Sequence, residues 1–157
     1  GAQRGMSAAA PLWLLLIQER VTLIQQAPGA QKAADLALPS GTATLRLHGE
    51  PPTPLQIEHA IESVEDAVMN VRAHLGADAR LATRDAALHA LARHADAAGG
   101  WLGIDAVEQL FSRLAARAAG RPAAQDALPV DGASAARLVI LRELLHHGAL
   151  SGLQLID

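Results

Sequence analysis

Residues 53–75 carry the strongest structural signal in the sequence and constrain its fold more than any other stretch. Thr53 can cap the first turn of a helix, Pro54 suits the first helical position, and Gln56 completes a capping box. Apolar residues then recur at intervals of three and four, namely Ile57, Ile61, Val64, Val68, Val71 and Leu75. This narrow stripe, followed by Gly76, predicts one long helix of the kind found in bundles and coiled coils.

Further helices are predicted on both sides of this one. Helical spacing and capping residues indicate helices over residues 83–98 and 105–118, with a loop at residues 77–82 between the long helix and the first of these. A last helix over residues 136–147 is apolar on most sides, which is typical of a helix in a core or a dimer interface. Residues 7–26 also keep a helical spacing, but residues 12–26 have strand-like composition, so helix and strand both remain open there.

A small amount of β-structure is predicted between the first two helical segments. Residues 36–38 and 42–48 flank a Pro39-Ser40-Gly41 turn, and the second run alternates apolar with polar residues. This pattern predicts a β-hairpin, which needs a helix or a further strand to be stable. Residues 153–156 could supply that strand or form a loose tail.

The composition favours helices over a β-sandwich. Half of the residues are apolar (50%), but they are largely Ala and Leu, while Tyr is absent and Phe occurs once. We therefore expect a mainly α fold, α+β in a strict count: a bundle of four to five helices with a small β-hairpin. Residues 7–157 are expected to form a single helical domain, and residues 1–6 to be a leftover cloning sequence that ends in the start Met.

Several functional classes are disfavoured by what the sequence lacks. Without cysteine there are no disulfides, thiolate nucleophiles or cysteine-ligated metals. The net charge of −3 and the few aromatic residues argue against a nucleic-acid partner. The apolar run at residues 11–17 is too short to span a bilayer, and no Gly-rich phosphate-binding loop is found. We expect a cytoplasmic protein without a cofactor or a membrane partner.

A histidine and carboxylate cluster is the best candidate for catalysis. His59, Glu62 and Asp66 are three and four residues apart on the face opposite the apolar stripe, within reach of one another. Glu143 and His146 form a single Glu-x-x-His motif on the last helix, whereas di-iron carboxylate bundles need two. The cluster could bind a metal or act in acid–base catalysis, or it could be a solvated helix face.

Charge is unevenly distributed along the chain. Between residues 49 and 79 six acidic residues stand against the single Arg72, whereas arginines recur every four residues near the end of the helix over residues 105–118. The Trp101 side chain could fill the core or anchor a partner. The partner-binding candidates are Glu58, Glu62, Glu65, Arg113, Arg117, Arg121 and Trp101.

These observations favour a non-enzymatic interaction module over an enzyme. The apolar stripe, the apolar last helix and the charge asymmetry predict an assembly or accessory factor that acts through helix contacts with a protein partner or a second copy, with a homodimer expected. The alternative is a metal- or acid/base-dependent enzyme that uses the histidine and carboxylate cluster.

Overall fold

The stretch predicted as a first helix is a pair of antiparallel strands, β1 (Leu12–Ile17) and β2 (Thr22–Gln26). The computed structural model describes residues 10–27 and 35–157, so the predictions for residues 1–6 and for the start of this helix lie outside the described residues. Along β1, Trp13, Leu15 and Ile17 are buried on one face, which is the two-residue period of a strand. The helix prediction is wrong here, and the strand alternative is confirmed.

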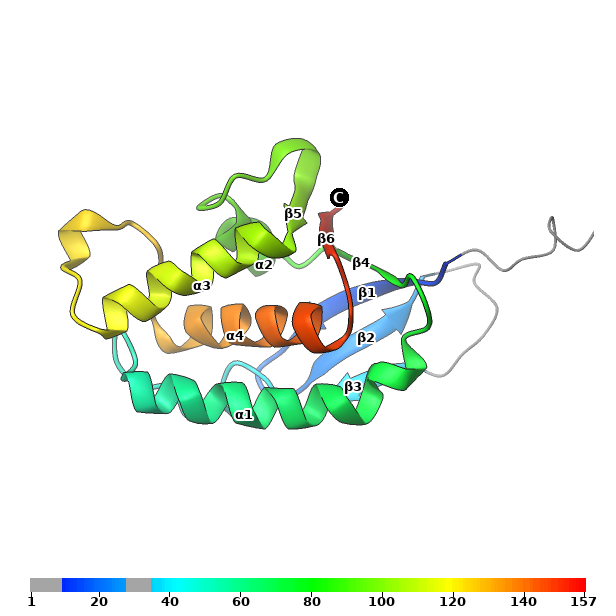
Figure 1. The fold of residues 1–157 in the computed structure, drawn as a ribbon, viewed down its shortest axis with the longest axis horizontal. Coiled ribbons are helices and arrows are strands. Elements are labelled where there is room, and N and C mark those ends of the chain that lie inside the picture. Colours follow the sequence, from blue (N-terminus) through cyan, green and yellow to red (C-terminus); the bar gives the residue numbers. More distant parts are fainter. Residues whose placement is uncertain (1–9, 28–34) are drawn as a thin grey trace, which may run out of the picture.

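The two strands belong to a six-stranded mixed sheet, which replaces the predicted bundle as the centre of the fold (Figure 1). The other strands are β3 (Leu36–Leu38), β4 (Arg80–Thr83), β5 (Trp101–Gly103) and β6 (Gly152–Leu155). Their order is β3-β2-β1-β4-β6-β5; β1, β4 and β6 run parallel, and the other pairs are antiparallel. The prediction of a helical bundle is therefore wrong, and the fold is α/β.

The predicted hairpin is also wrong. β3 pairs with β2, while residues 42–48 form turns and irregular backbone. This segment packs on the β1–β2 turn, where the Thr42 amide donates to the Gln18 carbonyl (2.9 Å). A strand does form near the C-terminus, as one of the two alternatives predicted, but β6 lies between β4 and β5.

The helices agree better with the sequence pattern. They are α1 (Pro54–Val71), α2 (Ala86–Ala92), α3 (Ile104–Ala118) and α4 (Gly132–His147). The capping box of α1 is confirmed, because the backbone N–H of Gln56 donates to Thr53 Oγ1 (3.1 Å) and the backbone N–H of Thr53 donates to Gln56 Oε1 (3.3 Å). Residues 72–74 continue α1 as a short 3-10 turn. None of the helices in the described part of the chain is long and apolar enough to cross a bilayer.

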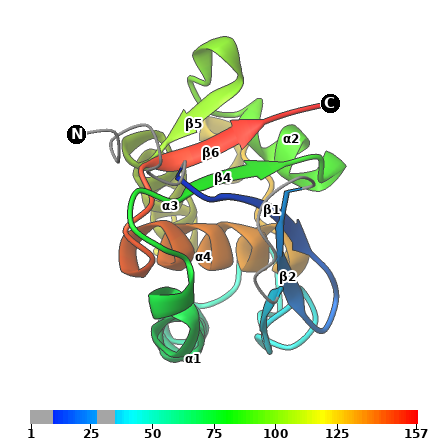
Figure 2. The same cartoon turned by 90° about the vertical axis from the view of Figure 1, so that its right-hand side faces the viewer.

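The apolar stripe of α1 is used inside the domain. Its residues Ile57, Val64 and Val68 are buried, and α1 packs along α4. Helix α4 lies between α1 and α3 below the sheet, which explains why it is apolar on most sides (Figure 2). The interpretation of α4 as a core helix is confirmed. The apolar stripe that led us to predict a bundle is buried against one neighbouring helix and the sheet.

Gly132, the first residue of α4, makes a testable contact with the segment before α1. A Cβ atom at this position would lie 2.2 Å from the Leu47 carbonyl oxygen. Alanine usually stabilises a helix relative to glycine, but we expect Gly132→Ala to lower the free energy of unfolding by about 1–3 kcal/mol because backbone must move. Urea unfolding would measure this change, and an increase in stability would contradict the close approach of Leu47 to α4.

Candidate functional site

The carboxyl ends of the parallel strands β1, β4 and β6 meet at one edge of the sheet. Polar residues follow each of these strands: Glu19 and Arg20 after β1, Arg84 and Asp85 after β4, and Asp157 after β6. In open α/β sheets, ligands bind outside the carboxyl ends of the strands. We call these five residues the strand-end site.

Hydrogen bonds hold the strand-end site in place. The Asp85 carboxylate accepts from the Ile17 amide (3.2 Å) and the Ala87 amide (3.0 Å), so it joins the end of β1 to the start of α2. The buried Thr83 hydroxyl donates to the Leu15 carbonyl (2.7 Å) and accepts from the Asp85 amide (3.0 Å). The Asp85 carboxylate is thus fixed by the backbone of two elements.

Arg84 is one of two exposed arginines of the strand-end site, the other being Arg20. Arg84 Nε donates to the Asp157 carbonyl (3.0 Å), which links the end of β4 to the residues after β6. Arg84 and Asp85 also line a pocket of about 200 Å³ together with Leu14, Leu16 and Gln25. An arginine that lines such a pocket can bind the oxygens of a carboxylate or phosphate.

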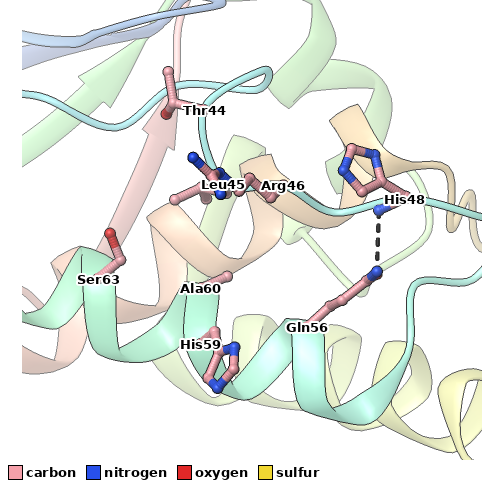
Figure 3. Close-up of a pocket in the computed structure, with 8 residues that line it drawn as sticks. All are labelled: Thr44, Leu45, Arg46, His48, Gln56, His59, Ala60 and Ser63. Atoms are coloured by element: carbon pink, nitrogen blue, oxygen red, sulfur yellow. Dashed lines mark hydrogen bonds between the residues drawn. The ribbon is translucent and has the colours of Figure 1, made fainter.

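A larger pocket, of about 450 Å³, lies between residues 44–48 and the first half of α1 (Figure 3). Gln56 spans one end of it, because its Oε1 accepts from the His48 amide (3.2 Å). His59 lines this pocket with Arg46, but none of its lining residues is acidic. The pocket therefore lacks the carboxylates that the histidine and carboxylate cluster would need.

The predicted cluster is only partly brought together. His59, Glu62 and Asp66 are exposed on α1, as is Glu58. Instead, Glu65 of α1 reaches α4, where His147 Nε2 lies 3.8 Å from Glu65 Oε1 and 3.3 Å from Glu143 Oε1. Glu143 thus pairs with His147, which sequence reasoning missed, although its spacing of four from Glu143 was visible.

His146 belongs to a second ion-pair group, with α3. Its Nε2 lies 3.2 Å from Glu108 Oε1, and Arg142 donates from Nε to both Glu108 oxygens (2.6 and 3.0 Å). Arg142 also donates to Glu143 Oε2 (2.9 Å) and stacks on the Phe111 ring, 4.1 Å from its centroid. Burial alone would raise the pKa of Glu108, but the hydrogen bonds and attraction of Arg142 and His146 together lower it.

The arginine stripe of α3 is occupied inside the domain. Arg113 makes a bidentate ion pair with the Asp126 carboxylate (2.9 and 2.6 Å). Arg117 Nη1 donates to the backbone carbonyl of Asp126 (3.5 Å), and Arg121 Nη1 lies 4.0 Å from the Asp126 carboxylate. The hydrogen bond from Arg113 is the main reason that the pKa of Asp126 is strongly lowered.

Trp101 is 40% exposed on β5, so its interpretation as a core residue is wrong.

Comparisons with known proteins find similarity in structure alone. No protein-family model and no curated protein sequence matches the chain. Among solved structures, the type II variant of the Aquifex aeolicus Ppx/GppA phosphatase is similar over 99% of this chain, with a TM-score of 0.69 and 14% identity. A second solved structure, of the Aquifex aeolicus member of the Ppx/GppA family, matches 96% of the chain, with a TM-score of 0.70 and 13% identity. The chain has the fold of part of a Ppx/GppA phosphatase.

The match covers only part of the neighbours. The chain spans 56% and 53% of the protein chains in these two Aquifex structures, and 55% of an exopolyphosphatase-like protein that it matches with a TM-score of 0.51 and 17% identity. At these identities the likeness is one of fold. It overturns the prediction of a non-enzymatic accessory module, because the apolar stripe and the apolar last helix on which that prediction rested are packed inside a domain with the α/β fold of part of a Ppx/GppA phosphatase.

Proposed function

We propose that this chain is a phosphate-binding domain of a phosphohydrolase, with the strand-end site as its ligand-binding edge. The observation that carries the proposal is the match of 99% of the chain to part of a Ppx/GppA phosphatase. The position of Arg84 and Asp85 at the carboxyl ends of the parallel strands supports the choice of site. One matched protein is described as exopolyphosphatase-like, so inorganic polyphosphate is the substrate we propose.

The proposed reaction is hydrolysis of a phosphoanhydride bond. Water attacks the terminal phosphorus, the bond to the bridging oxygen breaks, and the proton lost by the water ends on an oxygen of the products. Catalysis of phosphoryl transfer depends mainly on positioning and electrostatic stabilisation. Arg84 would bind the phosphoryl oxygens in place of a Gly-rich loop, and the fixed Asp85 carboxylate would orient the attacking water.

Arg84→Gln tests the site against a control on the same strand. Arg80 and Arg84 are exposed arginines at opposite ends of β4, so Arg80→Gln changes the net charge equally at the wrong edge. We expect Arg84→Gln to weaken polyphosphate binding at least about tenfold, as for loss of a charge-assisted hydrogen bond, and Arg80→Gln to weaken it less than about twofold. Isothermal titration calorimetry of the 157-residue chain would measure both.

Phosphate release from polyphosphate with Mg²⁺, followed colorimetrically on the same samples, tests the hydrolase part. Release by the chain that falls in the Arg84→Gln variant supports the proposal. Binding without release would contradict hydrolysis by this chain. Equal losses of binding in the two variants would contradict the strand-end site, because they would indicate a general effect of charge.

A further inference from the structure

The carboxylates and histidine between α1 and α4 form a second site, distinct from the strand-end site. His147 is the last residue of α4, and Glu143 precedes it by four residues, so both side chains lie on one helix face. Glu65 approaches from α1. One ligand atom from each of these three residues lies within 4.8 Å of the others. We call Glu65, Glu143 and His147 the helix-pair site.

The charge of this region favours a cation. Arg142 pairs with the carboxylates of Glu108 and Glu143, and the third carboxylate, that of Glu65, lies beside His147; three carboxylates and one guanidinium leave a formal charge of −2 when the histidines are neutral. Glu143 is only 2% exposed, and a buried carboxylate needs compensation by hydrogen bonds and opposite charge. Arg142 satisfies Glu143 Oε2, whereas Oε1 faces His147 and Glu65.

We propose that the helix-pair site binds one Zn²⁺ through Glu65, Glu143 and His147. Imidazole nitrogen with carboxylate oxygen is a common zinc ligand set, and three protein ligands leave one tetrahedral position for water. The hydrogen bond from Arg142 to Glu143 Oε2 is the kind of outer contact that orients a ligating carboxylate. The ion would join α1 to α4 and so stabilise the folded chain.

The helix-pair site lies at the opposite edge of the sheet from Arg84. Helix α4 ends shortly before β6 begins, and α1 ends shortly before β4 begins, so the ends of both helices lie near the amino ends of these strands. The zinc proposal therefore does not depend on the proposed phosphate-binding function, and the two can fail separately. Arg84→Gln should leave zinc binding unchanged.

Zinc titration of the chelator-treated 157-residue chain tests the proposal. We expect one equivalent of bound Zn²⁺ by calorimetry and by metal analysis after dialysis, with a rise in Tm. The variants Glu65→Gln and His147→Gln should each bind Zn²⁺ at least about tenfold more weakly and lose the rise in Tm. Glu65 is partly exposed, so the first of these should fold normally.

Two control variants lie beside the site. Glu62→Gln removes an exposed carboxylate one turn earlier on α1, and His146→Gln removes the neighbouring imidazole, which contacts Glu108. Both should bind Zn²⁺ within about twofold of the unaltered chain. The proposal is overturned if no saturable equivalent binds, if Glu65→Gln lowers the Tm of the zinc-free chain but leaves its zinc affinity unchanged, or if His146→Gln is the variant that loses the ion.

Discussion

Replacing Trp13 with alanine is expected to lower the free energy of unfolding by about 3–5 kcal/mol, a large part of the stability of a domain this size. The indole is 1% exposed at the centre of the sheet. Its Nε1–H donates to the Leu75 carbonyl (2.9 Å), which joins β1 to the turn that follows α1. Alanine would leave both a cavity and a buried carbonyl without its partner. Urea unfolding followed by far-UV circular dichroism would measure the change without relying on tryptophan fluorescence.

Two further variants separate the parts of this effect. Trp13→Phe keeps most of the ring volume but removes the donor to Leu75, so we expect a smaller loss of about 1–3 kcal/mol. Leu16 lies on the other face of β1 and is 37% exposed, so Leu16→Ala should cost less than either change at Trp13. If Trp13→Ala and Leu16→Ala proved equally costly, the assignment of the two faces of β1 would be wrong.

The helices could be predicted because their signals are local. The capping box at Thr53 and the three-to-four spacing of Ile57, Val64 and Val68 arise within one segment, and the structure places α1 accordingly. The strands β4 and β5 are four and three residues long, too short to show a period. Residues 77–82 were therefore predicted as a loop, although β4 begins at Arg80. The pairing of β4 and β5 with distant strands is what makes them strands.

The first helix was predicted wrongly for a different reason. Every position of β1 is apolar, which hides the alternation that marks a half-buried strand. Leu14, Ile17, Val21 and Ile24 also happen to follow a helical spacing, although a turn separates the first two from the last two. The four residues share that spacing although they lie in two strands and the turn between them.

The candidate sites depend on contacts between distant segments. Sequence spacing identified Glu143 as a candidate ligand, and its spacing of four from His147 was visible, but only the packing of α1 on α4 brings Glu65 to them. Likewise, Arg84 and Asp85 become candidate site residues only because β1, β4 and β6 run parallel and end at the same edge of the sheet. A single sequence carries no local signal for the approach of Glu65 to α4 or for the shared edge at which these strands end.

Asp126→Asn is expected to lower the free energy of unfolding by about 2–3 kcal/mol at neutral pH, because it removes the charge-assisted bonds from Arg113. The Asp126 side chain is only 5% exposed, so water would replace these bonds poorly. Thermal unfolding should show a fall in Tm of several degrees. Asp96→Asn, at an exposed aspartate, is the matched control and should have little effect.

The pH dependence of this pair has a definite sign. Hydrogen bonds from Arg113 and the Leu128 amide hold the pKa of Asp126 in the folded chain well below the ordinary value of 3.8. A lowered folded-state pKa means that the stabilisation is fully present above the unfolded-state pKa and is lost as the pH falls below it toward the folded-state value. The stability difference between the unaltered chain and Asp126→Asn should therefore be constant from pH 5 to 7, a range about one to three units above the unfolded-state pKa. It should shrink below about pH 4. A difference that grew on acidification would show that the carboxylate is not held by Arg113.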